Sequence, residues 1–290
     1  MIVATIPALL AHLVDSATTD IDGDDSPAEA VDAHRRHSRA WYGDLVGLLV
    51  VRTSTVPTVA RDGALAGLPV AVVADTGIDR LDGALAALRA AGAQVRRAEA
   101  AVARRGEDPL PGLRHLLEVW ERLRDAEPEL VMHAEIPLTG GLMDALDALA
   151  GAMSTPARLG ATFRIGGLAG ELFPSPQVLA GVICACRDRG LRFTVNAGLD
   201  RALRHNDHET GFTHHGVLNL LAGCLAATAG ASQAAVAERL ATNDALALSE
   251  VIRSGRDVPR PLWISYVADR MDEIVHDLTV FDILANEGTG

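Results

Sequence analysis

Residues 159–196 read LGATFRIGGLAGELFPSPQVLAGVICACRDRGLRFTVN, and this stretch decides the fold. It opens with an apolar run at 159–165 and closes with a second at 191–196, each typical of a strand. Between them, Ser175 is placed to cap a helix that opens with proline, runs through Cys186 and ends at Gly190. A strand, a helix and a second strand in succession build parallel sheets with helical crossovers.

The same alternation extends outward over the chain. Apolar runs predict further strands at 45–51, 69–74, 94–99, 130–136 and 262–267. Helical spacing predicts helices at 79–91, 113–124, 142–149, 214–229, 233–240 and 244–252. The pattern predicts an α/β fold, a TIM-barrel-like barrel that is seven-stranded or irregular. An open doubly wound sheet is the alternative, but no Gly-x-Gly-x-x-Gly follows the first strand.

The organisation predicted is a single domain over 1–290 with an N-terminal helical extension at 1–44. That extension reads as a short apolar helix, an acidic loop at 15–25 and a polar helix at 27–41. No stretch rich in proline, glycine or serine separates two halves.

The basic side chains exclude one branch of chemistry. All 26 are arginine, and a guanidinium stays protonated, so no lysine Schiff base can form on this chain.

A net charge of -12 opposes binding to nucleic acid or anionic membranes. The opening residues lack a basic leader and no apolar stretch is long enough to span a bilayer, so we expect a cytoplasmic protein. The sequence allows assembly into a homo-oligomer and does not predict its size.

The cysteines predict neither a disulfide framework nor a metal site. Cys184, Cys186 and Cys224 include no Cys-x-x-Cys pair, and residues two apart on a helix point in different directions. Buried free thiols are expected, and the sequence predicts no cofactor.

Candidate site residues are polar side chains at the predicted strand ends, where barrels place their chemistry. His133 and Glu135 alternate onto one face of their strand and are candidates for general acid and base or for metal ligands. A buried pair that serves only packing is an equal alternative. Asn196, at the end of another strand, is a candidate donor to developing oxyanion charge.

A second group of residues at the predicted strand ends suggests a binding site for an anionic substrate. Arg164 stands at a strand end before Gly166 and Gly167, where a guanidinium and close backbone amides can hold a carboxylate or phosphate. A tight turn is the alternative. Arg52 and Tyr266, at the ends of the first and last predicted strands, complete the predicted substrate contacts.

The segment 205–215 concentrates four of the ten histidines. It is interpreted as a loop, and no His-Glu-x-x-His spacing marks it as a zinc site. His215 is a candidate proton carrier, because the positive end of the following helix favours a neutral imidazole. Metal coordination by the segment remains an alternative.

Several short motifs together resemble a group of largely uncharacterised actinobacterial β/α-barrel (TIM-barrel-like) proteins. They are Tyr42-Gly43-Asp44-Leu45, Glu135-Ile136-Pro137-Leu138, Arg164-Ile165-Gly166-Gly167, Ala197-Gly198-Leu199, Gly216-Val217-Leu218-Asn219 and Asp272-Glu273. In that group two strands carry lysines where this chain has Thr162 and Thr194. The resemblance implies a divergent member in which any amine chemistry is absent.

These observations predict a lyase or isomerase acting on a small, oxygenated, anionic metabolite by acid–base chemistry, and a role in secondary metabolism fits. Two alternatives stay open. One is a catalytically silent barrel that binds a metabolite or partner protein. The other is a metal-dependent hydrolase or lyase using His133, Glu135 and the histidine-rich segment.

Overall fold

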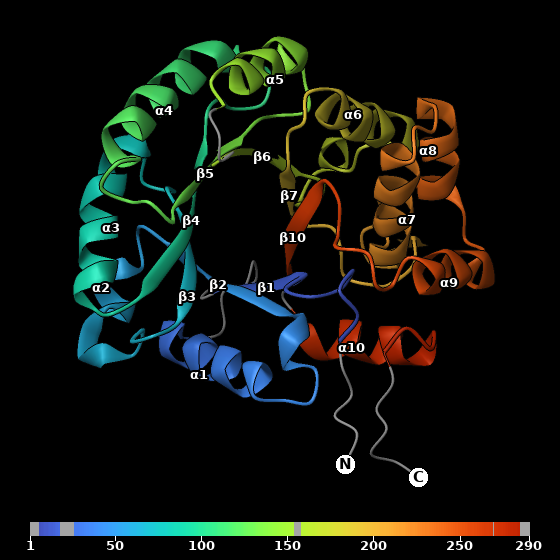
Figure 1. Cartoon of the computed structure of the whole chain (residues 1–290), viewed down its shortest axis with the longest axis horizontal. Coiled ribbons are helices and arrows are strands. Elements are labelled where there is room, and N and C mark those ends of the chain that lie inside the picture. The colour runs from blue at the N-terminus through green and yellow to red at the C-terminus, as the bar shows by residue number, and fades with distance from the viewer. Residues whose placement is uncertain (1–5, 18–25, 154–157, 269, 285–290) are drawn as a thin grey trace. The chain divides into compact units, whose positions relative to one another are not determined.

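The computed structural model describes residues 6–17, 26–153, 158–268 and 270–284. Within these residues, eight strands form a closed barrel in the order β1-β10-β7-β6-β5-β4-β3-β2, and helices connect most successive strands (Figure 1). The predicted TIM-barrel-like α/β fold is therefore confirmed, with eight strands where seven were predicted.

The barrel strands are β1 (Val14–Ala17), β2 (Val46–Arg52), β3 (Pro69–Val73), β4 (Gln94–Ala101), β5 (Val131–Glu135), β6 (Leu159–Arg164), β7 (Phe193–Asn196) and β10 (Trp263–Ala268). A separate two-stranded ribbon consists of β8 (His205–Asn206) and β9 (Thr213–His214). The α-helices are α1 (Pro27–Ser38), α2 (Val56–Val59), α3 (Leu81–Ala90), α4 (Pro109–Leu123), α5 (Leu142–Gly151), α6 (Pro176–Asp188), α7 (Val217–Thr228), α8 (Gln233–Ala241), α9 (Ala245–Ser254) and α10 (Met271–Val280).

The N-terminal extension is predicted correctly in one part and wrongly in two. The polar helix expected at 27–41 is α1, but residues 8–12 form turns in place of a short apolar helix, and β1 (Val14–Ala17) stands where the acidic loop was expected to begin. The strand is short, and the buried Asp15 interrupts its apolar character, so the sequence carries no strand signal there. Of the predicted acidic loop, residues 18–25 lie outside the described part of the chain.

The chain divides into two compact units. The β2–β6 unit comprises Asp15–Arg36 and Leu48–Phe163, and the β7–β10 unit comprises Met1–Val14, His37–Gly47 and Arg164–Gly290.

In the β2–β6 unit, parallel pairing fixes which side chains are neighbours. Glu99 on β4 pairs with His133 on β5, and Ala101 pairs with Glu135. Helix α3 packs on β4, and α4 packs on β5 and α5 (Figure 1). The guanidinium of Arg158 lies 4.9 Å from the centre of the Trp120 ring on α4.

In the β7–β10 unit, β7 and β10 pair in parallel, and α6, α7 and α8 pack against one another (Figure 1). Ser175 caps α6 by accepting a hydrogen bond from the Val178 amide at 3.3 Å, as the sequence predicted. Asn219 on α7 is fully buried and donates to the carbonyls of Arg239 and Thr242 at 3.0 and 2.7 Å, which ties the end of α8 to α7.

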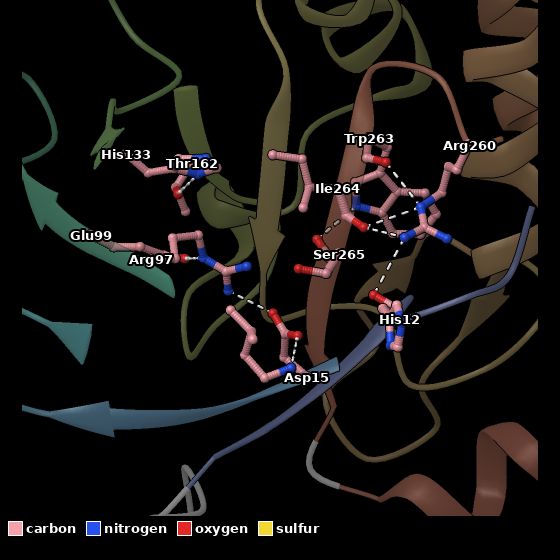
Figure 2. Close-up of polar contacts among 11 residues, drawn as sticks. His12, Asp15, Arg97, Glu99, His133, Thr162, Arg260, Trp263, Ile264 and Ser265 are labelled. Atoms are coloured by element: carbon pink, nitrogen blue, oxygen red, sulfur yellow. Dashed lines mark hydrogen bonds and ion pairs between the residues drawn. The ribbon is translucent and has the colours of Figure 1, made fainter. Parts of the chain in front are cut away.

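Arg260 ties the N-terminal segment to β10 inside the same unit (Figure 2). Its guanidinium donates to the carbonyls of Leu9 at 2.7 Å and Ala11 at 3.0 Å, and to that of Trp263 at 2.9 Å. Because one planar group satisfies carbonyls of two segments, the residues before β1 are held in place without regular secondary structure.

No helix among the described residues combines the length and the apolar character needed to cross a membrane.

Candidate functional site

A buried ion cluster lies in the β2–β6 unit (Figure 2). Arg97 donates to Glu99 Oε1 at 2.5 Å and to Asp15 Oδ2 at 2.6 Å, and Asp15 also accepts from the Leu48 amide at 2.7 Å. Burial opposes the guanidinium charge, but the carboxylates of Asp15 and Glu99 outweigh it and raise the pKa of Arg97. This arginine is therefore a permanent cation that fixes two carboxylates, and it has no role in moving protons.

His133 and Glu135 lie on β5, so the alternation of an extended strand places them on one face, as predicted. His133 is fully buried, and its Nδ1 lies 3.3 Å from the hydroxyl of Thr162 on β6 (Figure 2). Glu135 is half-buried. The proton-transfer role predicted for the pair stays a prediction.

The carboxyl ends of β2 and β3 carry a hydroxyl-rich cluster around Asp75. Its carboxylate accepts from the Thr53 hydroxyl at 2.7 Å, and from the Ser54 hydroxyl and amide at 2.5 and 3.0 Å. Partial burial opposes its charge, but these hydrogen bonds and the charge of Arg52 lower the pKa of Asp75. The Arg52 side chain is exposed, so it is accessible for the substrate contact predicted.

The glycines after β6 are explained by close backbone packing. A Cβ on Gly166 would lie 2.5 Å from the Gly198 Cα, and one on Gly198 would lie 2.5 Å from the Ile165 carbonyl oxygen. Gly167 has φ +152°, and its Cβ would lie 2.6 Å from Leu172 Cδ1. The contact between the loops after β6 and β7 therefore requires Gly166 and Gly198 even without an anion, and the positive φ of Gly167 favours glycine there.

Two of the polar residues predicted for the site are the last residues of β6 and β7. Arg164, the last residue of β6, has an exposed side chain, and Asn196, the last of β7, is half-buried. The Asn196 carbonyl accepts from the Ile165 amide at 3.1 Å, and the next residue, Ala197, has φ +61°. A positive φ at a residue other than glycine stores strain, and such strain concentrates at functional sites.

Tyr266 on β10 is 1% exposed, and its hydroxyl has no hydrogen-bond partner among the described residues. Burial, followed by the charges of Asp200 and Asp277, raises its pKa well above the ordinary value. The phenol therefore stays protonated at neutral pH, with a proton to donate.

The histidine-rich segment is a β-hairpin, which corrects its interpretation as a loop. His205 pairs with His214, and Asn206 pairs with Thr213, in antiparallel register. The turn is held by Asp207, whose carboxylate accepts from the amides of Glu209 and Thr210 at 3.0 and 2.7 Å. Asp207 and Gly211 favour this turn, because aspartate accepts hydrogen bonds from nearby amides and glycine readily adopts the φ of +72° found at Gly211.

The hairpin brings three possible metal-ligating groups together. One donor atom each from Asp200, His205 and His214 lies within 4.8 Å of the other two. His214 Nδ1 lies 2.6 Å from Asp200 Oδ2, and the centres of the His205 and His214 imidazole rings are 5.1 Å apart. Phe173 packs on the His214 ring at 4.7 Å between ring centres.

His215 points to a different partner from its neighbour. Its Nε2 donates to the Pro174 carbonyl at 2.8 Å, and its Nδ1 is buried with no partner among the described residues. Burial lowers the pKa of His215; the charges of Arg204 and His214 add to this, and the bond to Pro174 opposes it. The neutral ring thus presents an unprotonated Nδ1, and burial is the main cause, where the sequence suggested the helix dipole.

A cavity of about 300 Å³ adjoins His215 in the β7–β10 unit. Its walls include Arg204, whose buried Nε has no hydrogen-bond partner among the described residues. Phe173 and Phe212 supply an apolar wall with their ring centres 5.0 Å apart. The lining residues are Gly170, Phe173, Pro174, Ser175, Pro176, Arg204, Gly211, Phe212, Thr213 and His215.

Of the residues predicted for the site, only His215 lines this cavity. Arg164, Gly166, Gly167, Asn196 and Tyr266 belong to the same unit, whereas Arg52, His133 and Glu135 belong to the β2–β6 unit. Arg204 and Asp200 were not predicted as site residues. Their position beside the histidine-rich segment is the one sequence signal for them.

Comparison with known proteins identifies no family: no family model matches the chain, and no curated protein does. Among solved structures, a thermostable mutant of the xylanase Xyn10A from Cellvibrio japonicus aligns with a TM-score of 0.43 and 11% identity. The alignment covers 92% of this chain and 86% of that one. A likeness of this degree carries no inference about activity.

Proposed function

We propose that the protein is an enzyme of lyase or isomerase type that moves a proton on a small, oxygenated, anionic metabolite. The observation that carries the proposal is the cavity of the β7–β10 unit, whose lining includes His215 and Arg204. Each of these residues has a buried nitrogen without a partner among the described residues, the acceptor Nδ1 of His215 and the donor Nε of Arg204. Buried polar atoms without partners cost free energy, about 1–3 kcal/mol each. A ligand that carries an oxyanion and a removable proton would satisfy both.

The position of the cavity supports this assignment. Its lining comes from residues 170–176, after β6, and from residues 204–215, after β7. Both segments follow the carboxyl ends of barrel strands, which is where barrel enzymes place their catalytic groups. The cavity also includes Ser175 and Pro176 at the start of α6, and the positive end of a helix favours an anion.

In the proposed reaction, Arg204 binds the anionic group and His215 Nδ1 accepts the proton. The bond from His215 Nε2 to the Pro174 carbonyl holds the ring in the tautomer that a base requires. Phe173 and Phe212 exclude water from one side, which strengthens the electrostatic contacts. No imine is involved, since the chain has no lysine.

The other roles that the sequence predicts are proposed separately from this cavity, each within its own unit. They assign proton transfer to His133 and Glu135, oxyanion stabilisation to Asn196, and substrate contacts to Arg52, Arg164, Gly166, Gly167 and Tyr266. A role in secondary metabolism, and membership of the actinobacterial barrel group that the sequence resembles, belong to the same proposal.

The test is turnover of a panel of small carboxylates and phosphorylated compounds, followed by mass spectrometry. We expect His215→Gln to lose at least about a hundredfold in turnover, the lower range for a general base, and Arg204→Gln to raise KM. His208→Ala, an exposed histidine in the same hairpin, is the matched control. Glu135→Gln and Arg164→Ala test the wider set of roles.

Undiminished turnover by His215→Gln, with circular dichroism showing an intact fold, would overturn the assignment of the base. Binding of a panel compound without any product from the wild type would overturn the enzyme proposal. That result would establish a catalytically silent binding barrel in its place.

A further inference from the structure

We propose that Asp200, His205 and His214 bind a divalent transition-metal ion. Their donor atoms lie within 4.8 Å of one another, and the ligands of a tetrahedral zinc ion lie about 3.4 Å apart, as bonds of about 2.1 Å require. The side chain of Asp200 is 47% exposed, and its 2.6 Å contact with His214 Nδ1 is the one that an ion between the two ligands would replace. This inference does not rest on the proposed function, because none of the three residues lines the cavity beside His215.

The hairpin holds the two histidines in advance of binding. His205 on β8 and His214 on β9 are directly opposite in the ribbon, where side chains on one face have Cβ atoms about 5 Å apart. The hydrogen bonds of Asp207 to the amides of the turn fix the register of that pair. Preorganisation of this kind lowers the entropy lost when the ligands converge on an ion.

The hydrogen bonds around His205 select the nitrogen that is available to a metal. His205 Nδ1 donates to the Leu203 carbonyl at 3.2 Å, which leaves the lone pair on Nε2. Metal-bound histidines commonly donate their other ring nitrogen to a carbonyl or carboxylate in this way. Packing of Phe173 on the His214 ring restrains the second imidazole.

The donor set indicates the class of ion. Two imidazoles and one carboxylate suit Zn²⁺, Co²⁺ or Fe²⁺, whereas Mg²⁺ and Ca²⁺ prefer oxygen ligands. The exposure of Asp200 leaves the outer side of the site open to water. Three protein ligands and an open position are the arrangement in which a metal activates a bound water.

The test is calorimetric titration of the full-length protein, purified without an affinity tag, with Zn²⁺ and separately with Mg²⁺. We expect one equivalent of Zn²⁺ to bind and Mg²⁺ to give no binding heat. Co²⁺ in place of Zn²⁺ is expected to give the visible absorption of a site with nitrogen and oxygen ligands.

The variants separate metal binding from a structural role of the same residues. Asp200→Asn keeps the hydrogen-bonding shape, and His205→Phe keeps a ring beside His214. Each is expected to weaken Zn²⁺ binding at least tenfold. His208→Ala is the control from the same hairpin and should bind as the wild type does.

His215→Gln separates this site from the proposed base, because it leaves all three donors in place and should retain Zn²⁺. Failure of the wild type to bind Zn²⁺ would overturn the inference. Equal Zn²⁺ affinity in the wild type, Asp200→Asn and His205→Phe would also overturn it.

Discussion

At the scale of single residues, Arg97 shows how a side chain can be essential to the interior without taking part in chemistry. It neutralises Asp15 and Glu99, and all three are at most 4% exposed. Without the guanidinium, two carboxylates would remain buried beside each other. Removing one partner of a buried ion pair is therefore far more costly than removing a surface one.

We predict that Arg97→Met lowers the free energy of unfolding by about 3–5 kcal/mol, the cost of leaving a buried charge without its partner. Its neighbour Arg96 pairs with Glu129 at the surface, where such pairs contribute about 0–1 kcal/mol. Urea denaturation of Arg97→Met and Arg96→Met measures the difference. Equal stability of the two variants would contradict the role given to the cluster.

The sequence identified some of these residues and missed others for physical reasons. The shared face of His133 and Glu135 followed from strand alternation alone, and His215 from its place in a histidine-rich segment. Asp15 and Arg97 carried no such signal, because their burial depends on segments far apart in the chain. Gly166 and Gly167 suggested an anion site. The structure gives each a backbone reason, which is the contact with Gly198 for Gly166 and the positive φ for Gly167.

At the scale of elements, the strands were predictable and the hairpin was not. Continuous apolar runs at 69–74 and 159–165 mark strands covered on both faces, and β3 and β6 lie there. The strands β8 and β9 have two residues each, too few for any hydrophobic period to show. The same holds for β1, which has four.

Helices α6 and α7 carry the cysteines in a buried environment, as the sequence predicted. Burial raises the pKa of Cys186 to about 12 and that of Cys224 further. Burial also raises the pKa of Cys184, which is 7% exposed. Thiolates, the reactive form, are therefore scarce at ordinary pH.

We predict that the thiols of the native protein react with a disulfide reagent much more slowly than those of the same protein in denaturant, at pH 8. Absorbance of the released thiol measures both rates, and free cysteine at the same pH is the control. Rapid reaction of all three cysteines in the native state would contradict the packing described for α6 and α7.

At the scale of the whole molecule, a barrel fold alone does not state a function, because barrels support many chemistries through their loops. In this chain the loops after β6 and β7 bring together the cavity at His215 and Arg204. The loop after β7 and the hairpin also hold Asp200, His205 and His214. The functional proposals therefore depend on these segments, while the apolar strands and helices explain why the chain folds.

Solvent hydrogen exchange tests the proposed proton abstraction most directly. Compounds that bind the protein would be incubated with it in D₂O, and deuterium gained at carbon would be followed by mass spectrometry. We predict exchange by the wild type and a rate at least about a hundredfold lower for His215→Gln, as loss of a general base requires. If no bound compound exchanges, or if His215→Gln exchanges as fast as the wild type, His215 is not the base and the proposed reaction is wrong.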